Sequence, residues 1–229
     1  MIPILYLYTL VDEEDPDHLG EGIAGEPLRL VHCGGIKAVT GEIIERPSPD
    51  RETLQAQDAV VRRLAERFSA LLPARFGEAF EDERALAGRI APRSRELTEA
   101  LALVRGCVQM TLRVFGAPEP TQEATPDPAW GAGRRYLETH RREQERARAL
   151  PEIDPLREVL RPLLRAERIE RHERHTAGRL LGTAYHLIAR AQTGAYLAAL
   201  ESAGERIGGR RVAASGPWPP YAFAPEAGR

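Results

Sequence analysis

Two histidines near residue 175 are the first residues to consider for chemistry. His172 and His175 are three positions apart, so on a helix they would share a face and could bind one metal ion. A metal site needs further ligands, and the position of Glu173 does not give the His-Glu-x-x-His spacing of zinc proteases. Arg171 and Arg174 add positive charge beside both imidazoles. We interpret the segment as a solvated, charged helix face.

The two cysteines and the remaining histidines give no better constellation. Cys33 and Cys107 are isolated thiols, which is typical of a reduced cytoplasmic protein rather than a disulfide framework. His32 precedes Cys33 in a predicted strand, where neighbours point to opposite faces and cannot easily share a ligand. An enzyme that uses His32, or the pair His172 and His175, remains the least favoured hypothesis.

A glycine pattern near the N-terminus matches the dinucleotide-binding fingerprint. The segment 20–25 reads Gly-Glu-Gly-Ile-Ala-Gly and follows a predicted strand. That fingerprint requires a helix to begin at the glycines and hold the pyrophosphate at its N-terminus. Here Pro27 and an extended stretch follow, and the loop 12–26 is rich in acidic residues that repel phosphate. We interpret the segment as a flexible loop.

Other catalytic and phosphate-binding motifs are missing from the sequence. It contains neither a Gly-x-Ser-x-Gly nucleophile elbow nor a Walker-type loop. Runs of acids such as 81–83 are typical of solvated faces. We therefore expect no catalytic residues, no metal, no cofactor and no enzymatic activity.

Charge excludes two classes of partner. The formal net charge of the 229 residues is −2, which gives no field to attract nucleic acid or an anionic membrane. Lys37 is the only lysine, but the many arginines are interleaved with acids. No run of 18 apolar residues exists, so we expect no membrane span.

The C-terminal string Gly-Pro-Trp-Pro-Pro-Tyr-Ala-Phe, residues 216–223, is the most distinctive segment. Prolines fix φ and remove N–H donors, so we expect the string not to continue a sheet. It would hold Trp218, Tyr221 and Phe223 in a stiff array. The array is either a clasp packed on the protein's own core or a docking site for an apolar partner. Both interpretations remain open.

The first half of the chain has the pattern of an α/β domain. Apolar strands are predicted at 4–11, 28–33 and 36–44, and Gly34-Gly35 between the last two indicates a hairpin. A helix begins near Asp50 and runs to Pro73, and a short extended stretch follows at 74–77. A helical zone at 82–105 is bent at Pro92, and a strand covers 107–115. This order resembles a ferredoxin-like sandwich with an added strand, over 1–116.

A proline-rich linker at 117–133 separates a second domain, 134–229. From 134 to about 175 the chain holds 12 arginines and nine carboxylates, and we predict a salt-bridged helical arm there, folded as a hairpin. An apolar stripe in it is formed by Leu156, Val159, Leu160, Leu163 and Leu164. A strand at 180–189, a helix at 192–206 and a strand at 210–214 complete a small α/β domain.

The string at 216–223 closely resembles the "GPWPPYSF" ending of gas vesicle proteins of the F/L family. Further motifs follow in the family's order: Tyr-Leu-Tyr at 6–8, Gly-Ile-Ala-Gly at 22–25, Leu-Pro-Ala-Arg-Phe-Gly at 72–77, Leu-Arg-Val at 112–114, the stretch 133–137, and Thr-Ala-Tyr-His-Leu at 183–187. The resemblance spans nearly the whole chain. Ala74, Glu78 and Ala222 depart from the usual family residues.

The resemblance implies a fold, a cellular location and binding partners. It implies an N-terminal modified ferredoxin-like domain and a second α/β domain with a charged helical arm. It also implies a non-enzymatic structural or assembly protein of gas vesicles within the cytoplasm. The expected partners are the small hydrophobic shell protein, of the GvpA type, and other gas vesicle accessory proteins.

We expect four residues to contact the shell protein. They are Arg75 and Phe76 in the short stretch at 74–77, and Trp218 and Tyr221 at the C-terminus. The alternative function is a ferredoxin-like regulatory module that binds a small molecule at a sheet edge or domain interface.

Overall fold

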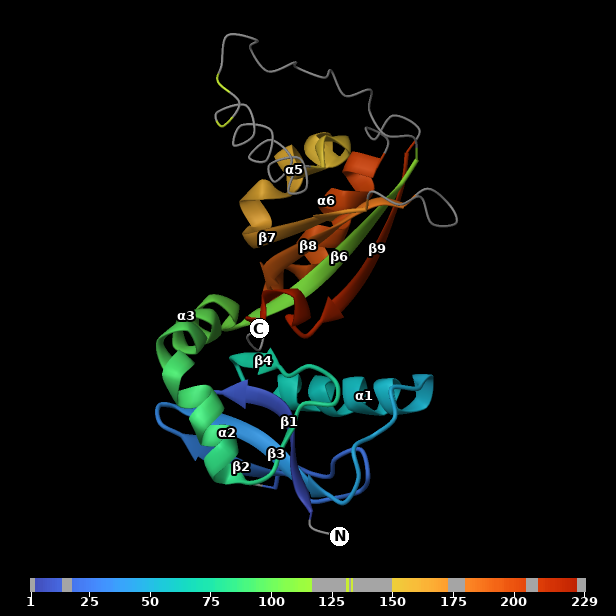
Figure 1. Cartoon of the computed structure of the whole chain (residues 1–229). Coiled ribbons are helices and arrows are strands. Elements are labelled where there is room, and N and C mark those ends of the chain that lie inside the picture. Colours follow the sequence, from blue (N-terminus) through green and yellow to red (C-terminus); the bar gives the residue numbers. More distant parts are fainter. Residues whose placement is uncertain are drawn as a thin grey trace. The chain divides into compact units, whose positions relative to one another are not determined.

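A computed structural model gives the fold of the chain, which divides into two compact units (Figure 1). The first unit is Met1–Gln109 together with Trp218–Arg229, and the second is Met110–Pro217. The structure describes residues 3–13, 18–116, 131, 133, 150–172, 180–204 and 210–225. The predicted linker and the first part of the predicted arm therefore lie almost entirely outside the described residues, as does His175.

The first unit is built on an antiparallel sheet in the order β2-β3-β1-β4, with β5 also paired to β1. Its strands are β1 Ile4–Val11, β2 Arg29–Cys33, β3 Ile36–Ile43, β4 Leu71–Pro73 and β5 Ala79–Phe80. The predicted hairpin is confirmed, since Cys33 pairs with Ile36 across a turn in which Gly34 has φ +75°. The central strand β1 is buried on both faces, as its continuous apolar run predicts.

Three helices cover this sheet: α1 Arg51–Arg67, α2 Glu83–Ile90 and α3 Ser94–Val104. Asp50 caps α1 by accepting a hydrogen bond from the Thr53 amide at 2.9 Å. The predicted bend at Pro92 is confirmed by the 3₁₀ turn Ala91–Arg93 between α2 and α3. The prediction that α1 continues to Pro73 is wrong, because residues 71–73 pair with β1 as β4.

Two buried tyrosines of β1 anchor the loops around the sheet. Tyr8 donates its hydroxyl hydrogen to Glu26 and accepts one from the Ile23 amide at 2.9 Å. The other oxygen of Glu26 accepts from the Ala24 amide at 2.9 Å. Tyr6 in turn donates to Gln57 of α1 and accepts from the Gly77 amide at 2.9 Å. These bonds satisfy groups that would be costly to bury unpaired.

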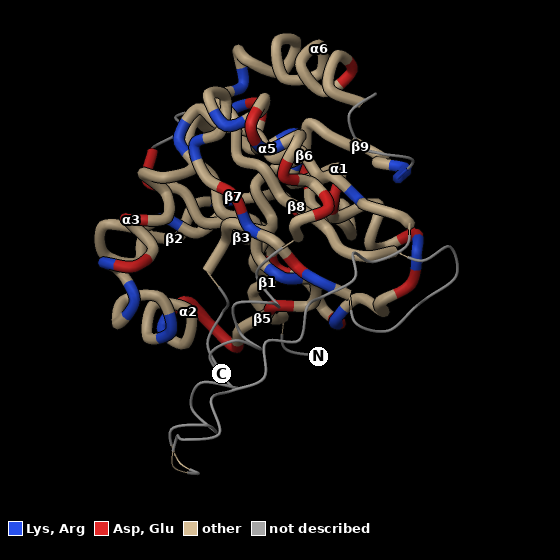
Figure 2. The backbone as a smooth tube through the Cα atoms, turned by 90° about the horizontal axis from the view of Figure 1, so that it is seen from above, with Lys and Arg blue, Asp and Glu red and all other residues tan. Residues whose placement is uncertain are grey.

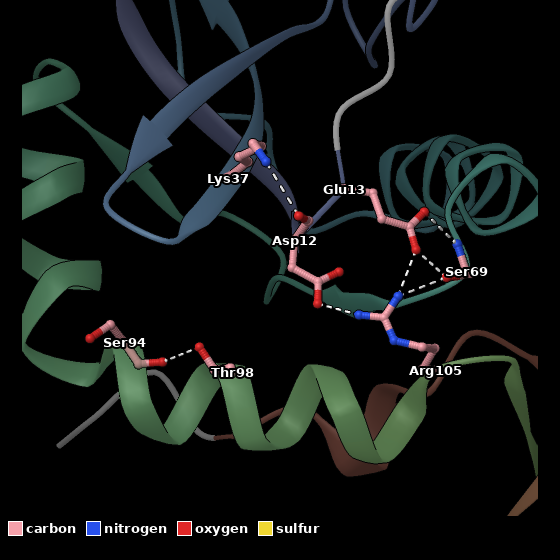
Figure 3. A network of polar contacts seen from close by, with 7 residues as sticks. All are labelled: Asp12, Glu13, Lys37, Ser69, Ser94, Thr98 and Arg105. Atoms are coloured by element: carbon pink, nitrogen blue, oxygen red, sulfur yellow. Dashed lines mark hydrogen bonds and ion pairs between the residues drawn. The ribbon is translucent and has the colours of Figure 1, made fainter.

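A polar network closes the end of the sheet where β1 finishes (Figure 3). Arg105, which follows α3, forms ion pairs with Asp12 and Glu13, the latter at 2.7 Å. Ser69 donates from both its amide and its hydroxyl to Glu13, and Lys37 reaches the Asp12 carbonyl at 3.3 Å. The hydrogen bonds from Ser69, assisted by Arg105 and opposed by partial burial, lower the pKa of Glu13.

The second unit contains a four-stranded sheet in the order β7-β8-β6-β9. Its strands are β6 Cys107–Phe115, β7 Leu164–Arg171, β8 Leu180–Ala189 and β9 Arg211–Trp218, and its helices are α5 Asp154–Leu160 and α6 Thr193–Gly204. Short 3₁₀ turns lie at Pro151–Ile153, Arg161–Leu163 and Arg190–Gln192. The expected α/β class is confirmed.

The strand at 107–115 was expected to complete the first domain, but β6 pairs into the second sheet. Most of its residues are buried, on both faces, as the position between two other strands requires. The division between the two units accordingly falls within this strand, after Gln109, and the C-terminal segment from Trp218 belongs with the first unit.

The predicted helical arm is wrong from residue 164 onward. The apolar stripe begins in α5, in which Leu156 and Leu160 are fully buried, but Pro162 and Leu163 lie in the 3₁₀ turn that ends this helical stretch. Residues 164–171 then form β7, antiparallel to β8. Arginine and glutamate favour helices in isolation, and pairing with β8 overrides that preference. His172 therefore follows a strand instead of lying on a helix.

The expectation that the C-terminal prolines exclude sheet structure is also wrong for the first of them. β9 continues to Trp218 and includes Pro217, which follows a cis peptide bond. The strand lies at the edge of the sheet order, where a missing N–H is tolerated.

A buried polar chain holds α6 against the second sheet. Nδ1 of His186 on β8 lies 2.7 Å from the Tyr196 hydroxyl of α6, and its Nε2 lies 3.1 Å from Glu167 on β7. Two guanidinium nitrogens of Arg157 on α5 donate hydrogen bonds to the Glu167 carboxylate, at 2.6 and 3.2 Å. Because the Glu167 carboxylate only accepts, Nε2 carries the proton and Nδ1 accepts from Tyr196. Burial opposes ionisation of Glu167, but the hydrogen bonds from His186 and Arg157 outweigh it and lower its pKa.

The packing of Gly41 on Glu26 generates a first prediction. A Cβ atom at Gly41 would lie 2.5 Å from Cγ of Glu26, whose carboxylate is fixed by Tyr8 and Ala24. We expect Gly41→Ala to lower the free energy of unfolding in urea by about 1–3 kcal/mol. In the control Gly88→Ala the new Cβ has no atom within 4 Å, and we expect stability unchanged or raised by up to about 1 kcal/mol. Equal effects would contradict the tight packing of Glu26.

The lowered pKa of Glu167 generates a second prediction. A carboxylate with a depressed pKa stabilises the folded state above its ordinary pKa of 4.5, and this stability is lost as pH falls through the folded-state pKa. We expect Glu167→Gln to cost about 2 kcal/mol in urea unfolding at neutral pH. The difference from the unmodified protein should shrink below pH 4.5. The exposed Glu158→Gln serves as control and should change stability by less than about 0.5 kcal/mol at any pH.

Candidate functional site

The C-terminal string is fixed on the first unit by its own buried residues. Pro219 and Pro220 are buried, and the 3₁₀ turn η5 Tyr221–Phe223 follows them. Phe223 is only 2% exposed. The side chain of Gln109 accepts a hydrogen bond from the Ala222 amide at 2.7 Å. The string therefore packs on its own domain as a clasp, and Phe223 is the aromatic ring that joins the core.

The other two aromatic rings of the string lie at the surface, against α1. The guanidinium of Arg62 lies over the Trp218 ring, 4.2 Å from its centre, in a cation–π contact. The Tyr221 hydroxyl donates to Asp58 at 2.9 Å, and Asp58 and Arg62 form an ion pair at 2.6 Å. Tyr221 remains 37% exposed and Trp218 is half-buried. These contacts preorganise two aromatic rings on the surface.

Leu54 extends this surface along the helix. Residues 54, 58 and 62 are spaced by four and share one face of α1, and Leu54 is 45% exposed. We name Leu54, Asp58, Arg62, Trp218 and Tyr221 the α1–C-terminal surface. It presents apolar and aromatic area together with one paired acid and base.

The electrostatics of this surface suit binding better than catalysis. Burial raises the pKa of Tyr221, and the neighbouring Asp58 carboxylate raises it further. The phenol therefore stays protonated and serves as a hydrogen-bond donor. Asp58 is occupied by Tyr221 and Arg62, so it is poorly placed to act as a free general base.

Arg75 and Phe76 lie in a turn between β4 and β5. The turn is held by the Ala74 amide, which donates to the Tyr8 carbonyl at 2.9 Å, and by the bond from Gly77 to Tyr6. Arg75 is exposed and Phe76 is half-buried. The predicted extended stretch at 74–77 is thus a turn, and the strand lies just before it, at 71–73.

The four predicted contact residues come from neighbouring segments of the first unit. The strand β4, which leads into Arg75 and Phe76, packs against η5, which begins at Tyr221. Sequence reasoning missed Asp58 and Arg62. Their i, i+4 spacing on α1 is a signal for an ion pair, but it does not identify the C-terminal rings as their partners.

The described residues offer few alternatives for chemistry. The Gly-rich segment 20–25 forms a turn in which Gly22 and Gly25 are hydrogen-bonded at 3.3 Å, and an extended stretch follows instead of a helix. His32 is exposed and Cys33 is buried, on opposite faces of β2 as predicted. Across the described ranges, no three His, Cys, Asp or Glu side chains are grouped to hold a metal ion.

No helix within the described part of the chain combines the length and apolar character needed to cross a lipid bilayer.

Similarity to known proteins covers nearly the whole chain. Residues 4–225 match the family model described as gas vesicle synthesis protein GvpL/GvpF. Gas vesicle protein L of a Streptomyces species is 29% identical over 234 residues, covering 89% of this chain and 85% of that protein. Gas vesicle protein F1 of Halobacterium salinarum is also 29% identical, over 51% of this chain and 57% of its own length.

Solved structures share the fold. The crystal structure of GvpF from Anabaena superposes with a TM-score of 0.72 at 17% identity, covering 97% of this chain and 96% of that one. GvpF from Microcystis aeruginosa gives the same TM-score at 21% identity, covering 98% of this chain and all of that one. The match of the family model over residues 4–225 establishes that the chain belongs to the GvpL/GvpF family of gas vesicle proteins.

Proposed function

We propose that this chain acts without enzymatic chemistry in building gas vesicles, at the vesicle within the cytoplasm. In this proposal it binds the small hydrophobic shell protein and presents it for assembly, alongside other gas vesicle accessory proteins. The membership of the chain in the GvpL/GvpF family supports the setting. The α1–C-terminal surface is the observation that carries the binding role.

Two preorganised aromatic rings support the proposed contact with the shell protein. Trp218 and Tyr221 offer large, rigid, amphipathic area, and aromatic residues of this kind dominate the energetics of many interfaces. Arg62 and Asp58 hold the rings before a partner arrives, so little side-chain entropy is lost on binding. The exposed Leu54 adds apolar area to the same helix face. An apolar shell subunit would cover this area and gain from its removal from water.

Arg75 and Phe76 extend the proposed contact along the neighbouring turn. Hydrogen bonds to the Tyr6 hydroxyl and the Tyr8 carbonyl fix the backbone of this turn, so its side chains occupy defined positions. Phe76 would add aromatic area and Arg75 a donor at the rim, where polar residues are common in interfaces.

The direct test is capture of the tagged shell protein by the full chain after co-expression. We expect Tyr221→Ala to reduce the captured amount at least about tenfold, as for a central aromatic contact. The matched control is Tyr185→Ala in the second unit, because the half-buried Tyr185 also donates its hydroxyl hydrogen to a carboxylate, that of Glu170, at 3.1 Å. The control should retain capture.

The same capture experiment also tests the turn that contains Arg75 and Phe76. Arg75→Ala should weaken capture, while Arg95→Ala, with a side chain 93% exposed on α3, should not. Thermal unfolding of each variant checks that it is folded. Equal capture by all variants, or normal flotation of cells that lack the gene, would overturn the proposal.

A further inference from the structure

The two described helices of the second unit, α5 and α6, lie on one face of its sheet. Tyr196 of α6 bonds to His186, so α6 lies on the face to which His186 points. Glu167 lies beside His186 in the register of β7 and β8 and accepts two hydrogen bonds from Arg157, so α5 lies on that same face. Tyr185 precedes His186 in the strand and therefore points to the opposite face, away from both helices.

Charged and aromatic side chains from all four strands gather around Tyr185. Its hydroxyl donates to Glu170 of β7 at 3.1 Å. Burial and the Glu170 carboxylate raise the pKa of Tyr185, and the positive charge of Arg113 on β6 opposes them. Phe115 lies two positions after Arg113 and shares its face, and the guanidinium of Arg211 on β9 lies over the Phe115 ring, 4.2 Å from its centre. With Arg168, which pairs with Tyr185 across the strands, these residues form what we name the open face: Arg113, Phe115, Arg168, Glu170, Tyr185 and Arg211.

Positive charge dominates the open face. Arg113, Arg168 and Arg211 are exposed there, against one exposed acid, Glu170. Neither Arg113 nor Arg211 forms an ion pair within the described part of the chain. Figure 2 shows basic residues in blue and acidic residues in red following each other along β7. The second unit, Met110–Pro217, holds 18 arginines and 14 acidic residues, so the near-neutral charge of the whole chain conceals a basic unit.

We propose that the open face binds an acidic, carboxylate-rich segment of a partner protein. The planar guanidinium of arginine matches the two oxygens of a carboxylate and donates two parallel hydrogen bonds to them. A guanidinium stacked on an aromatic ring keeps the donors at its edge available for such a contact. Phe115 holds Arg211 in this way before a partner arrives, so a carboxylate bound there costs little side-chain entropy.

The pattern of charge favours a peptide over a nucleic acid. Glu170 lies within the open face and would repel a continuous phosphate backbone, whereas a peptide can place a neutral residue opposite it. Alternate side chains of an extended peptide point to the same side, roughly 7 Å apart. We therefore expect a segment with Glu or Asp at alternate positions. This inference concerns the second unit and does not depend on the α1–C-terminal surface.

The test uses the full chain and two defined peptides, titrated by fluorescence anisotropy. The first is a fluorescein-labelled peptide of sequence Gly-Glu-Ala-Glu-Ala-Glu-Ala-Glu-Gly with a blocked C-terminus, and the second has Gln at every Glu position. We expect saturable binding of the Glu peptide and at least about tenfold weaker binding of the Gln peptide. Arg113→Gln and Arg211→Gln should each weaken binding of the Glu peptide at least about fivefold, because each removes a charged contact.

Two further variants check where the affinity comes from. The matched control is Arg161→Gln, because Arg161 is an exposed arginine of the same unit, lies in the 3₁₀ turn before β7, and also forms no ion pair within the described residues. It should change the affinity by less than about twofold. Glu170→Gln should raise the affinity about twofold or more, because it removes the repulsion between Glu170 and the peptide. Raising the NaCl concentration from about 50 to about 300 mM should weaken binding, since exposed charges are screened.

Four results would overturn the proposal. The first is a Glu peptide that does not saturate, and the second is equal binding of the two peptides. The third is an Arg161→Gln effect as large as those of Arg113→Gln and Arg211→Gln, since the net charge alone would then explain binding. The fourth is tighter, competing binding of a labelled oligothymidylate of about 12 nucleotides, since the open face would then recognise phosphate.

The result is separable from the proposed shell contact. Tyr221→Ala should leave binding of the Glu peptide intact, because Tyr221 belongs to the first unit and the open face to the second. Thermal unfolding checks that each variant is folded. If Arg211→Gln alone loses the folded state, Arg113→Gln and Glu170→Gln decide the test with their opposite expected effects on affinity.

Discussion

The need to satisfy two buried tyrosine hydroxyls governs the architecture of the first unit. Tyr6 and Tyr8 are fully buried in the central strand, and an unpaired hydroxyl there would cost free energy. Tyr6 takes Gln57 as its partner, which fixes α1 on the sheet. Asp58 follows Gln57 and faces outward, where it meets Tyr221. The buried hydrogen bond between Tyr6 and Gln57 thus fixes the position of the α1–C-terminal surface.

Local signals predicted much of the first unit. Gly34 and Gly35 between two apolar runs identified the hairpin, and Asp50 identified the start of α1, because turn and cap chemistry act over a few residues. The contact of Tyr221 with Asp58 joins residues 163 positions apart, and no local pattern encodes it. The C-terminal string identified Trp218 and Tyr221 as proposed contact residues, but no local pattern identified α1 as the helix that positions them.

The two wrong predictions for the second unit have a common physical cause. The stretch 164–171 is rich in arginine and glutamate, and it forms a strand because β8 supplies a pairing edge. Pro217 likewise lies in β9 because that strand is at the end of the sheet order. The polar chain of His186 is also non-local: its two partners lie on β7 and α6, and Arg157 of α5 joins the chain through Glu167. In each case tertiary context overrides a local preference.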